Sequence, residues 1–187
     1  MTSSRPTAIV SGTTASSSAM NTALGIAGGF YVVSQLAPSA VASISANSVF
    51  TSAAWAYRII GDLNCSAGGV LTFNLRAAGA DITTAASYKT NGSVLNSGAV
   101  AAWQFSTTYW QIGSTGAESI SFDMMIYRPY ETAVTRATWL AGNGTGLNQW
   151  AAAGSQTSVA TADGFSIGIT SGTMTGDIAI HAVRGDK

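Results

Sequence analysis

Polar and apolar positions alternate along this chain in short segments, which is the pattern of β-strands that turn one face to a core. Residues 71–76 are the clearest example, with three large apolar side chains separated by Thr, Asn and Arg. In residues 119–127 one face is wholly apolar, and the other carries Met125 and Tyr127. A second face that is partly apolar favours contact with a partner, so Met125 and Tyr127 are candidate subunit-interface residues.

Shorter signals of the same kind occur elsewhere, separated by Gly, Asn and Asp. We expect residues 164–169 and 176–183 to form a terminal hairpin, and Asn91 with Gly92 to form a hairpin turn. Weaker strand signals cover residues 30–35, 41–45, 55–60, 100–105, 109–112 and 134–140. No stretch beyond about ten residues keeps the apolar spacing of a helix. About ten short strands at this spacing predict an all-β fold, a sandwich or a barrel.

The first part of the chain differs from the rest, because no charged residue lies between Arg5 and Arg58 and residues 7–21 are mostly Ser, Thr and Ala. Such a segment buries too little apolar surface to form its own core. We therefore divide the chain into an N-terminal arm, residues 1–30, and a β-sandwich domain, residues 31–187. The arm is predicted to attach the protein to a partner. Its expected anchor is an apolar cluster comprising Leu24, Ile26, Phe30, Tyr31 and Val32.

Charge and cysteine content exclude several classes of function. The 187 residues include 8 Lys and Arg and 8 Asp and Glu, and no basic cluster is present, so we expect no nucleic-acid or anionic-membrane partner. The most apolar window, residues 24–33, is about half the ~20 residues that cross a bilayer. No secretion signal is expected at the N-terminus. With one cysteine, Cys65, and one histidine, the chain has too few ligands for a structural zinc site, and we expect no cofactor.

The sequence contains one pattern typical of serine hydrolases. Ser166 lies in a G-x-S-x-G sequence and is followed by Asp177 and His181. In α/β-hydrolases this motif forms a sharp turn between a strand and a helix. Here the alternation of a strand continues through it, which favours a structural role for all three residues. We therefore expect no serine-hydrolase activity.

Acidic residues suggest two further sites, neither of them specific. Asp62, Asn64 and Ser66 match the first half of a calcium loop, but Phe73 occupies the position of the final Glu. A Gly-rich turn between strands explains this segment better. Carboxylate pairs for glycoside hydrolysis are also available in any all-β protein with eight acids. The candidates are Glu118, Asp123 and Glu131.

Aromatic residues gather near predicted loops. Trp103, Tyr109 and Trp110 surround a Ser-Thr-Thr turn, and Trp150 follows the Gly-rich residues 142–146. Aromatic rings near loops stack on sugars, but in antiparallel sheets they more often fill a core or a subunit interface. The four residues are therefore candidate glycan or partner contacts, with packing as the alternative.

Several segments resemble virion proteins of tailed bacteriophages, namely residues 57–61, 69–76, 81–88, 163–169 and 171–178. In the small fibre, spike and decoration proteins of these phages, a jelly-roll domain closes with a "DGF…SGT-x-TG-x-I" hairpin. The resemblance covers about residues 50–187. It implies a homotrimeric, antiparallel jelly-roll-like β-sandwich on the virion surface, with no catalytic residues.

Composition agrees with this resemblance, because a particle protein that is polar without charge packs against its copies without like-charge repulsion. We expect a non-enzymatic virion structural protein, assembled in the bacterial cytoplasm, that contacts itself and the major capsid protein. A capsid decoration or head spike is favoured, because the chain is short and has no fibrous shaft. One alternative is a tail-fibre tip that binds a host surface glycan in an aromatic groove. Another is a small polysaccharide hydrolase, which needs convergent acids in a cleft.

Overall fold

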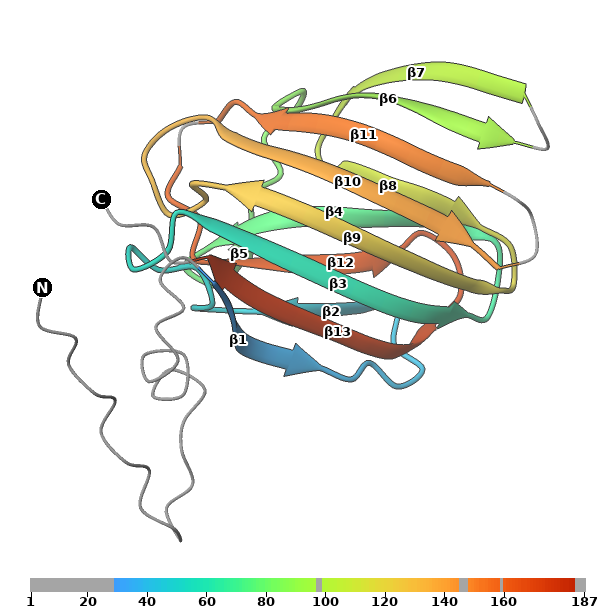
Figure 1. Ribbon diagram of the computed structural model, residues 1–187, viewed down its shortest axis with the longest axis horizontal. Coiled ribbons are helices and arrows are strands. Elements are labelled where there is room, and N and C mark those ends of the chain that lie inside the picture. The colour runs from blue at the N-terminus through green and yellow to red at the C-terminus, as the bar shows by residue number, and fades with distance from the viewer. Residues whose placement is uncertain (1–28, 97–98, 145–147, 159, 184–187) are drawn as a thin grey trace, which may run out of the picture.

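The computed structural model describes residues 29–96, 99–144, 148–158 and 160–183. Within these ranges the chain forms thirteen strands and no helix. Two antiparallel sheets pack against each other as a β-sandwich (Figure 1). The predicted all-β, jelly-roll-like class is confirmed.

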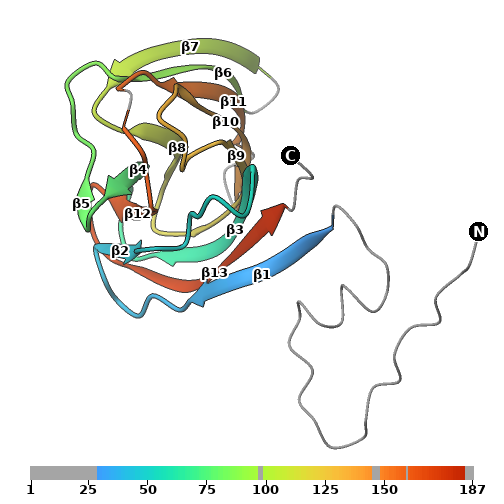
Figure 2. The same ribbon diagram turned by 90° about the vertical axis from the view of Figure 1, so that its left-hand side faces the viewer.

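The larger sheet has eight strands and curves around the smaller one (Figure 2). Its strands, in spatial order, are β1 (Phe30–Leu36), β13 (Met174–Val183), β3 (Ala56–Cys65), β9 (Ser119–Tyr127), β10 (Thr135–Asn143), β11 (Gln149–Gln156), β6 (Tyr88–Asn96) and β7 (Ala99–Thr107). The smaller sheet contains β2 (Ser43–Ala46), β12 (Gly164–Ile169) and β4 (Gly69–Ala77), with β5 (Ala80–Asp81) and β8 (Trp110–Thr115) both paired to β4.

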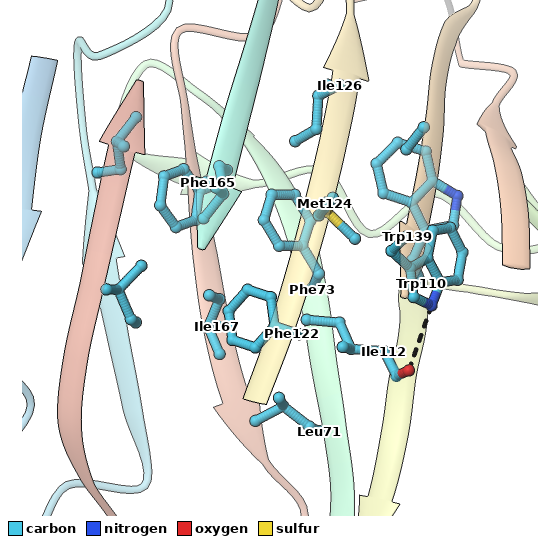
Figure 3. Packing of buried hydrophobic residues seen from close by; sticks show 14 of the residues in the cluster. Leu71, Phe73, Trp110, Ile112, Phe122, Met124, Ile126, Trp139, Phe165 and Ile167 are labelled. Atoms are coloured by element: carbon cyan, nitrogen blue, oxygen red, sulfur yellow. Dashed lines mark hydrogen bonds between the residues drawn. The ribbon is translucent and has the colours of Figure 1, made fainter. Parts of the chain in front are cut away.

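Alternate residues of the facing strands fill the space between the sheets (Figure 3). The apolar face of β9 is buried along its whole length, as its pattern predicts. It meets the apolar faces of β4 and β12, where the rings of Phe73 and Phe165 stack with centroids 5.1 Å apart. Trp110 and Trp139 extend this packing from β8 to β10, with ring centroids 6.2 Å apart.

A buried hydrogen bond also joins the sheets. Trp139 Nε1 on β10 donates to the carbonyl oxygen of Ile112 on β8 at 3.2 Å (Figure 3). The β4–β8 pairing shifts register between Leu71 and Thr72, which leaves Ile112 with no residue opposite it. A bulged residue of this kind loses its place in the ladder, and the indole of Trp139 gives the carbonyl a partner.

The prediction that residues 164–169 and 176–183 form a terminal hairpin is wrong. β12 pairs with β2 and β4 in the smaller sheet, whereas β13 pairs with β1 and β3 in the larger one. The turn around Gly172, which has a φ of +78°, carries the chain from one sheet to the other. Alternation shows which face of a strand is buried, but both sheets bury a face in the same core, so the pattern is identical in the two arrangements.

The prediction of a hairpin turn at Asn91 and Gly92 is also wrong, because both residues lie inside β6. Gly92 is flanked by Trp103 on β7 and Ala152 on β11. A Cβ atom at position 92 would lie 2.6 Å from the Cβ of Ala152, so the close packing of the strands requires glycine here. Neither β6 nor β11 was expected as a strand.

Strand β1 is the first element of the described residues. Strand β1 begins at Phe30, one residue before the expected start of the sandwich at residue 31. Three residues of the predicted anchor, Phe30, Tyr31 and Val32, therefore belong to the larger sheet. Leu24 and Ile26 lie outside the described residues.

Candidate interaction surface

The larger sheet directs one face toward the core and the other away from the smaller sheet, and we call the second the outer face. Side chains on the outer face stand directly opposite one another from strand to strand. One such row runs through Ile60, Asp123, Leu140, Ala151 and Ser93 on β3, β9, β10, β11 and β6. Residues distant in sequence therefore share one surface.

The outer face contains a hollow of about 700 Å³, which we call the outer groove. Its apolar side chains are unusually open to solvent, since Leu140 is 63% exposed and Val100 is 72% exposed. Polar groups lie among them, including Gln149, Ser93 and two carboxylates. Its outward-facing lining residues are Ile60, Asp62, Ser93, Leu95, Val100, Ser121, Asp123, Leu140, Gln149 and Ala151.

A second hollow of about 490 Å³ adjoins the outer groove and shares Asp123 and Leu140 with it. Here Arg58 forms a bidentate ion pair with Asp123, with Nε donating to Oδ1 at 2.9 Å and Nη2 to Oδ2 at 2.5 Å. The hydrogen bond to Asp123 raises the pKa of the Arg58 guanidinium. The guanidinium also lies 5.6 Å from the ring centroid of Phe30, a cation–π distance. The pairing neutralises the two charged side chains that line the second hollow.

Further carboxylates stand at one border of the outer groove. Asp62 on β3 is directly opposite Asp177 on β13, and Ser121 Oγ donates to Asp62 Oδ1 at 3.0 Å. Like charges in opposite positions repel. Within the described ranges, no group of three His, Cys, Asp or Glu side chains is placed to hold a metal ion. The calcium-loop pattern instead spans a strand and a turn, with Asp62 and Asn64 in β3 and Phe73 buried in the core.

Both predicted interface residues lie on the outer face. Met125 and Tyr127 are half-buried on β9, and Met125 lines the second hollow. The ring of Tyr127 packs beside Trp55, with centroids 5.8 Å apart. Their position agrees with the sequence pattern, and their contact with another subunit stays a prediction.

The anchor residues within β1 divide between the two faces. Phe30 and Val32 are 46% and 43% exposed, whereas Tyr31 packs against the core. Phe30 also lines the second hollow. The end of the predicted arm is therefore continuous with the outer face.

Two of the four candidate aromatic contacts are excluded by burial. Trp110 is fully buried and Trp150 is 5% exposed, so neither ring offers a face to a sugar. These two residues pack in the core, which is the alternative the sequence left open. Trp103 and Tyr109 are half-buried, and the ring of Trp103 lies 5.1 Å from that of Phe105.

Sequence reasoning missed the most exposed apolar side chains, Leu140 and Val100. Leu140 points away from the buried side of its strand, and Val100 stands in a run of alanines. Single exposed apolar residues are common on protein surfaces. Only the pairing of β10, β11, β6 and β7 brings these two side chains together with Leu95 in one hollow.

No described residue belongs to a helix that is long and apolar enough to cross a membrane. Comparisons of this chain with family models, with curated proteins and with solved structures find no match.

The hydrolase pattern does not assemble into a triad. Ser166 lies on the smaller sheet, where its Oγ donates to Asp81 Oδ1 at 3.0 Å. Asp177 and His181 lie on β13 in the larger sheet and point away from the core. Packed sheets are about 10 Å apart, so the core separates the serine from the other two groups.

The three acids proposed for glycoside hydrolysis are likewise dispersed. Glu118 immediately precedes β9, Asp123 stands in its middle, and Glu131 follows its end. A nine-residue strand is about 30 Å long, and Asp123 is already paired with Arg58. This set does not form the close carboxylate pair that the reaction needs.

Proposed function

We propose that this chain is a non-enzymatic structural protein of a bacteriophage virion, a capsid decoration or head-spike protein that assembles as a homotrimer. The observation that carries the proposal is the outer face, where exposed apolar side chains line two adjoining hollows. Large exposed apolar patches mark interaction sites on soluble proteins. A surface that joins this protein to its copies is therefore assigned to the two hollows of the outer face.

Charge supports association between identical chains. Arg58 and Asp123 neutralise each other within the face, so another copy of the chain that packs there meets little like-charge repulsion. The whole chain has a formal net charge of zero at pH 7. The virion setting and the trimer come from the resemblance to phage decoration, spike and fibre proteins.

The first test is the mass of the protein in solution. Light scattering at micromolar concentration should give about three times the chain mass of 18.9 kDa. Leu140→Asp places a charge in the outer groove and should dissociate the assembly. Val134→Asp is a matched control, because Val134 is an exposed apolar residue outside both hollows. A wild-type monomer, or equal dissociation by both variants, would count against the proposal.

The second test concerns attachment to the particle. Deletion of residues 1–19 should leave the melting temperature of the sandwich and its trimer unchanged, and should abolish incorporation into particles. Electron microscopy of intact particles should then locate the wild-type protein on the capsid and show those sites empty in the deletion strain. Normal incorporation of the shortened chain would refute a role of this segment in attachment.

The outer groove also supports a second candidate, a tail-fibre tip that binds a host surface glycan. Asp62, Ser93, Ser121 and Gln149 offer hydrogen-bonding groups beside apolar side chains, a combination suited to sugar hydroxyls and ring faces. Calorimetric titration with surface polysaccharide from the host distinguishes the candidates. Saturable binding that is lost in Gln149→Ala would favour the fibre tip, and absence of binding would favour the decoration protein.

A further inference from the structure

Strand β7 is an unusual edge. Exposed strand edges pair readily with other chains, and proteins protect them with short strands, bulges, charges or proline. Among the described strands, the other edges have such protection: β1 shifts register against β13, β8 shifts register against β4, β2 has four residues and β5 two. β7 has nine residues, pairs with β6 without a shift, and contains neither a charged residue nor proline.

The inward face of β7 is also incompletely covered. β8, the nearest strand of the smaller sheet, packs across the core against β10, β6, β11 and β9, and makes few contacts with β7. Phe105 on β7 is consequently 40% exposed although it points to the core side. Trp103 Nε1 is buried and has no hydrogen-bond partner among the described residues. One more strand beside β7 would cover both rings.

We propose that residues 20–27 of a second copy of the chain form that strand. Their sequence, MNTALGIA, has no charge and alternates the larger Met20, Thr22, Leu24 and Ile26 with small or polar residues. This period of two is the pattern of a strand with one buried face. Antiparallel or parallel pairing with β7 would turn Leu24 and Ile26 toward the exposed ring of Phe105.

The donor must be another copy because of the reach of the chain. Only two residues separate Ala27 from Phe30 in β1, and β1 and β7 are opposite edges of an eight-stranded sheet (Figure 2). Seven strand spacings of about 4.8 Å amount to roughly 34 Å around the sheet. Three peptide units span about 10 Å. Residues 20–27 therefore do not reach β7 of their own sandwich.

Residues 20–27, which precede β1, would leave one copy and pair with β7 of the next. This is a head-to-tail contact, which closes into a ring when the rotation allows it. A ring of three such contacts gives the trimer of the proposed function, on whose self-association this inference rests. Residues 1–19 stay available for attachment to the particle.

Two pairs of variants of the full chain test the inference. Ala101→Asp and Ala102→Asp place the same charge at neighbouring exposed positions of β7. Ala101 lies on the face shared with Trp103, and Ala102 lies on the outer face but outside both hollows. Leu24→Asp with Ile26→Asp changes the face predicted to be buried, and Ala23→Asp with Ala27→Asp changes the opposite face. Circular dichroism establishes that each variant is folded. Light scattering gives its mass, and hydrogen exchange measured by mass spectrometry follows the amides of β7.

We expect Ala101→Asp and the Leu24/Ile26 variant to be monomers in which the β7 amides exchange at least tenfold faster than in the wild type. The Ala102 and Ala23/Ala27 controls should keep the trimer and the protection of β7. A wild-type trimer whose β7 amides exchange rapidly, or a Leu24/Ile26 variant that keeps both properties, would overturn the inference and leave the proposed function standing. A wild-type monomer would contradict both.

Discussion

The hydrogen bond between Trp139 and Ile112 makes a quantitative prediction about stability. Trp139→Phe keeps an aromatic ring in the core but removes the donor to the Ile112 carbonyl, which the bulge in β8 leaves without a residue opposite it. A buried carbonyl that loses a hydrogen-bond donor costs about 1–3 kcal/mol, in addition to the packing lost with the smaller ring. Trp139→Phe should therefore destabilise the fold by more than its change in volume requires.

Trp110→Phe is a matched control for the packing contribution. Trp110 is fully buried and its ring lies 6.2 Å from that of Trp139, but its Nε1 is buried without a hydrogen-bond partner among the described residues. The two substitutions remove the same atoms, and only Trp139→Phe removes a hydrogen bond. We expect Trp139→Phe to be less stable than Trp110→Phe by about 1–3 kcal/mol.

Chemical and thermal unfolding measure this difference. For a domain of this size it corresponds to about 2–12 °C in Tm. Both variants and the wild type are compared at one protein concentration, because association raises apparent stability by mass action. Equal stability of the two variants, or a less stable Trp110→Phe, would refute the role assigned to the Trp139 indole.

Three further predictions concern single positions. Gly92→Ala should lower Tm strongly, because its Cβ would lie 2.7 Å from a backbone carbonyl oxygen of β11. Gly142→Ala should be tolerated, because the nearest atom to its Cβ is 3.8 Å away. Thermal melts of the two variants measure the difference in Tm. Asp177→Asn should raise Tm, more at low than at high salt, since it removes the like charge opposite Asp62; an unchanged Tm at low salt would contradict this. Burial raises the pKa of Tyr88. Its phenol therefore stabilises the fold below its ordinary pKa of about 10, and this contribution is lost as the pH rises above that value. Between pH 9 and 11, the free energy of unfolding in urea should decline less for Tyr88→Phe than for the wild type.

Much of the candidate surface was not accessible to sequence reasoning. The pattern of residues 119–127 places Met125 and Tyr127 on the outer face, and the structure shows them there. The outer groove is different, because β3, β9, β10, β11, β6 and β7 all contribute to it. Leu140 and Val100 are neighbours only through strand pairing, and no local pattern marks them.

The sequence by itself determined the class of fold and the side of each strong strand that is buried. Residues 119–127 and 164–169 form strands with the predicted bounds and the predicted inward faces, because a two-residue period follows directly from the pleat of a strand. Tertiary structure decided the rest. The partners of β12 and β13, the strand around Gly92 and the burial of Trp110 all depend on residues far along the chain. Alternation specifies a face, whereas the sheet and the neighbours of a strand are selected by packing over the whole core.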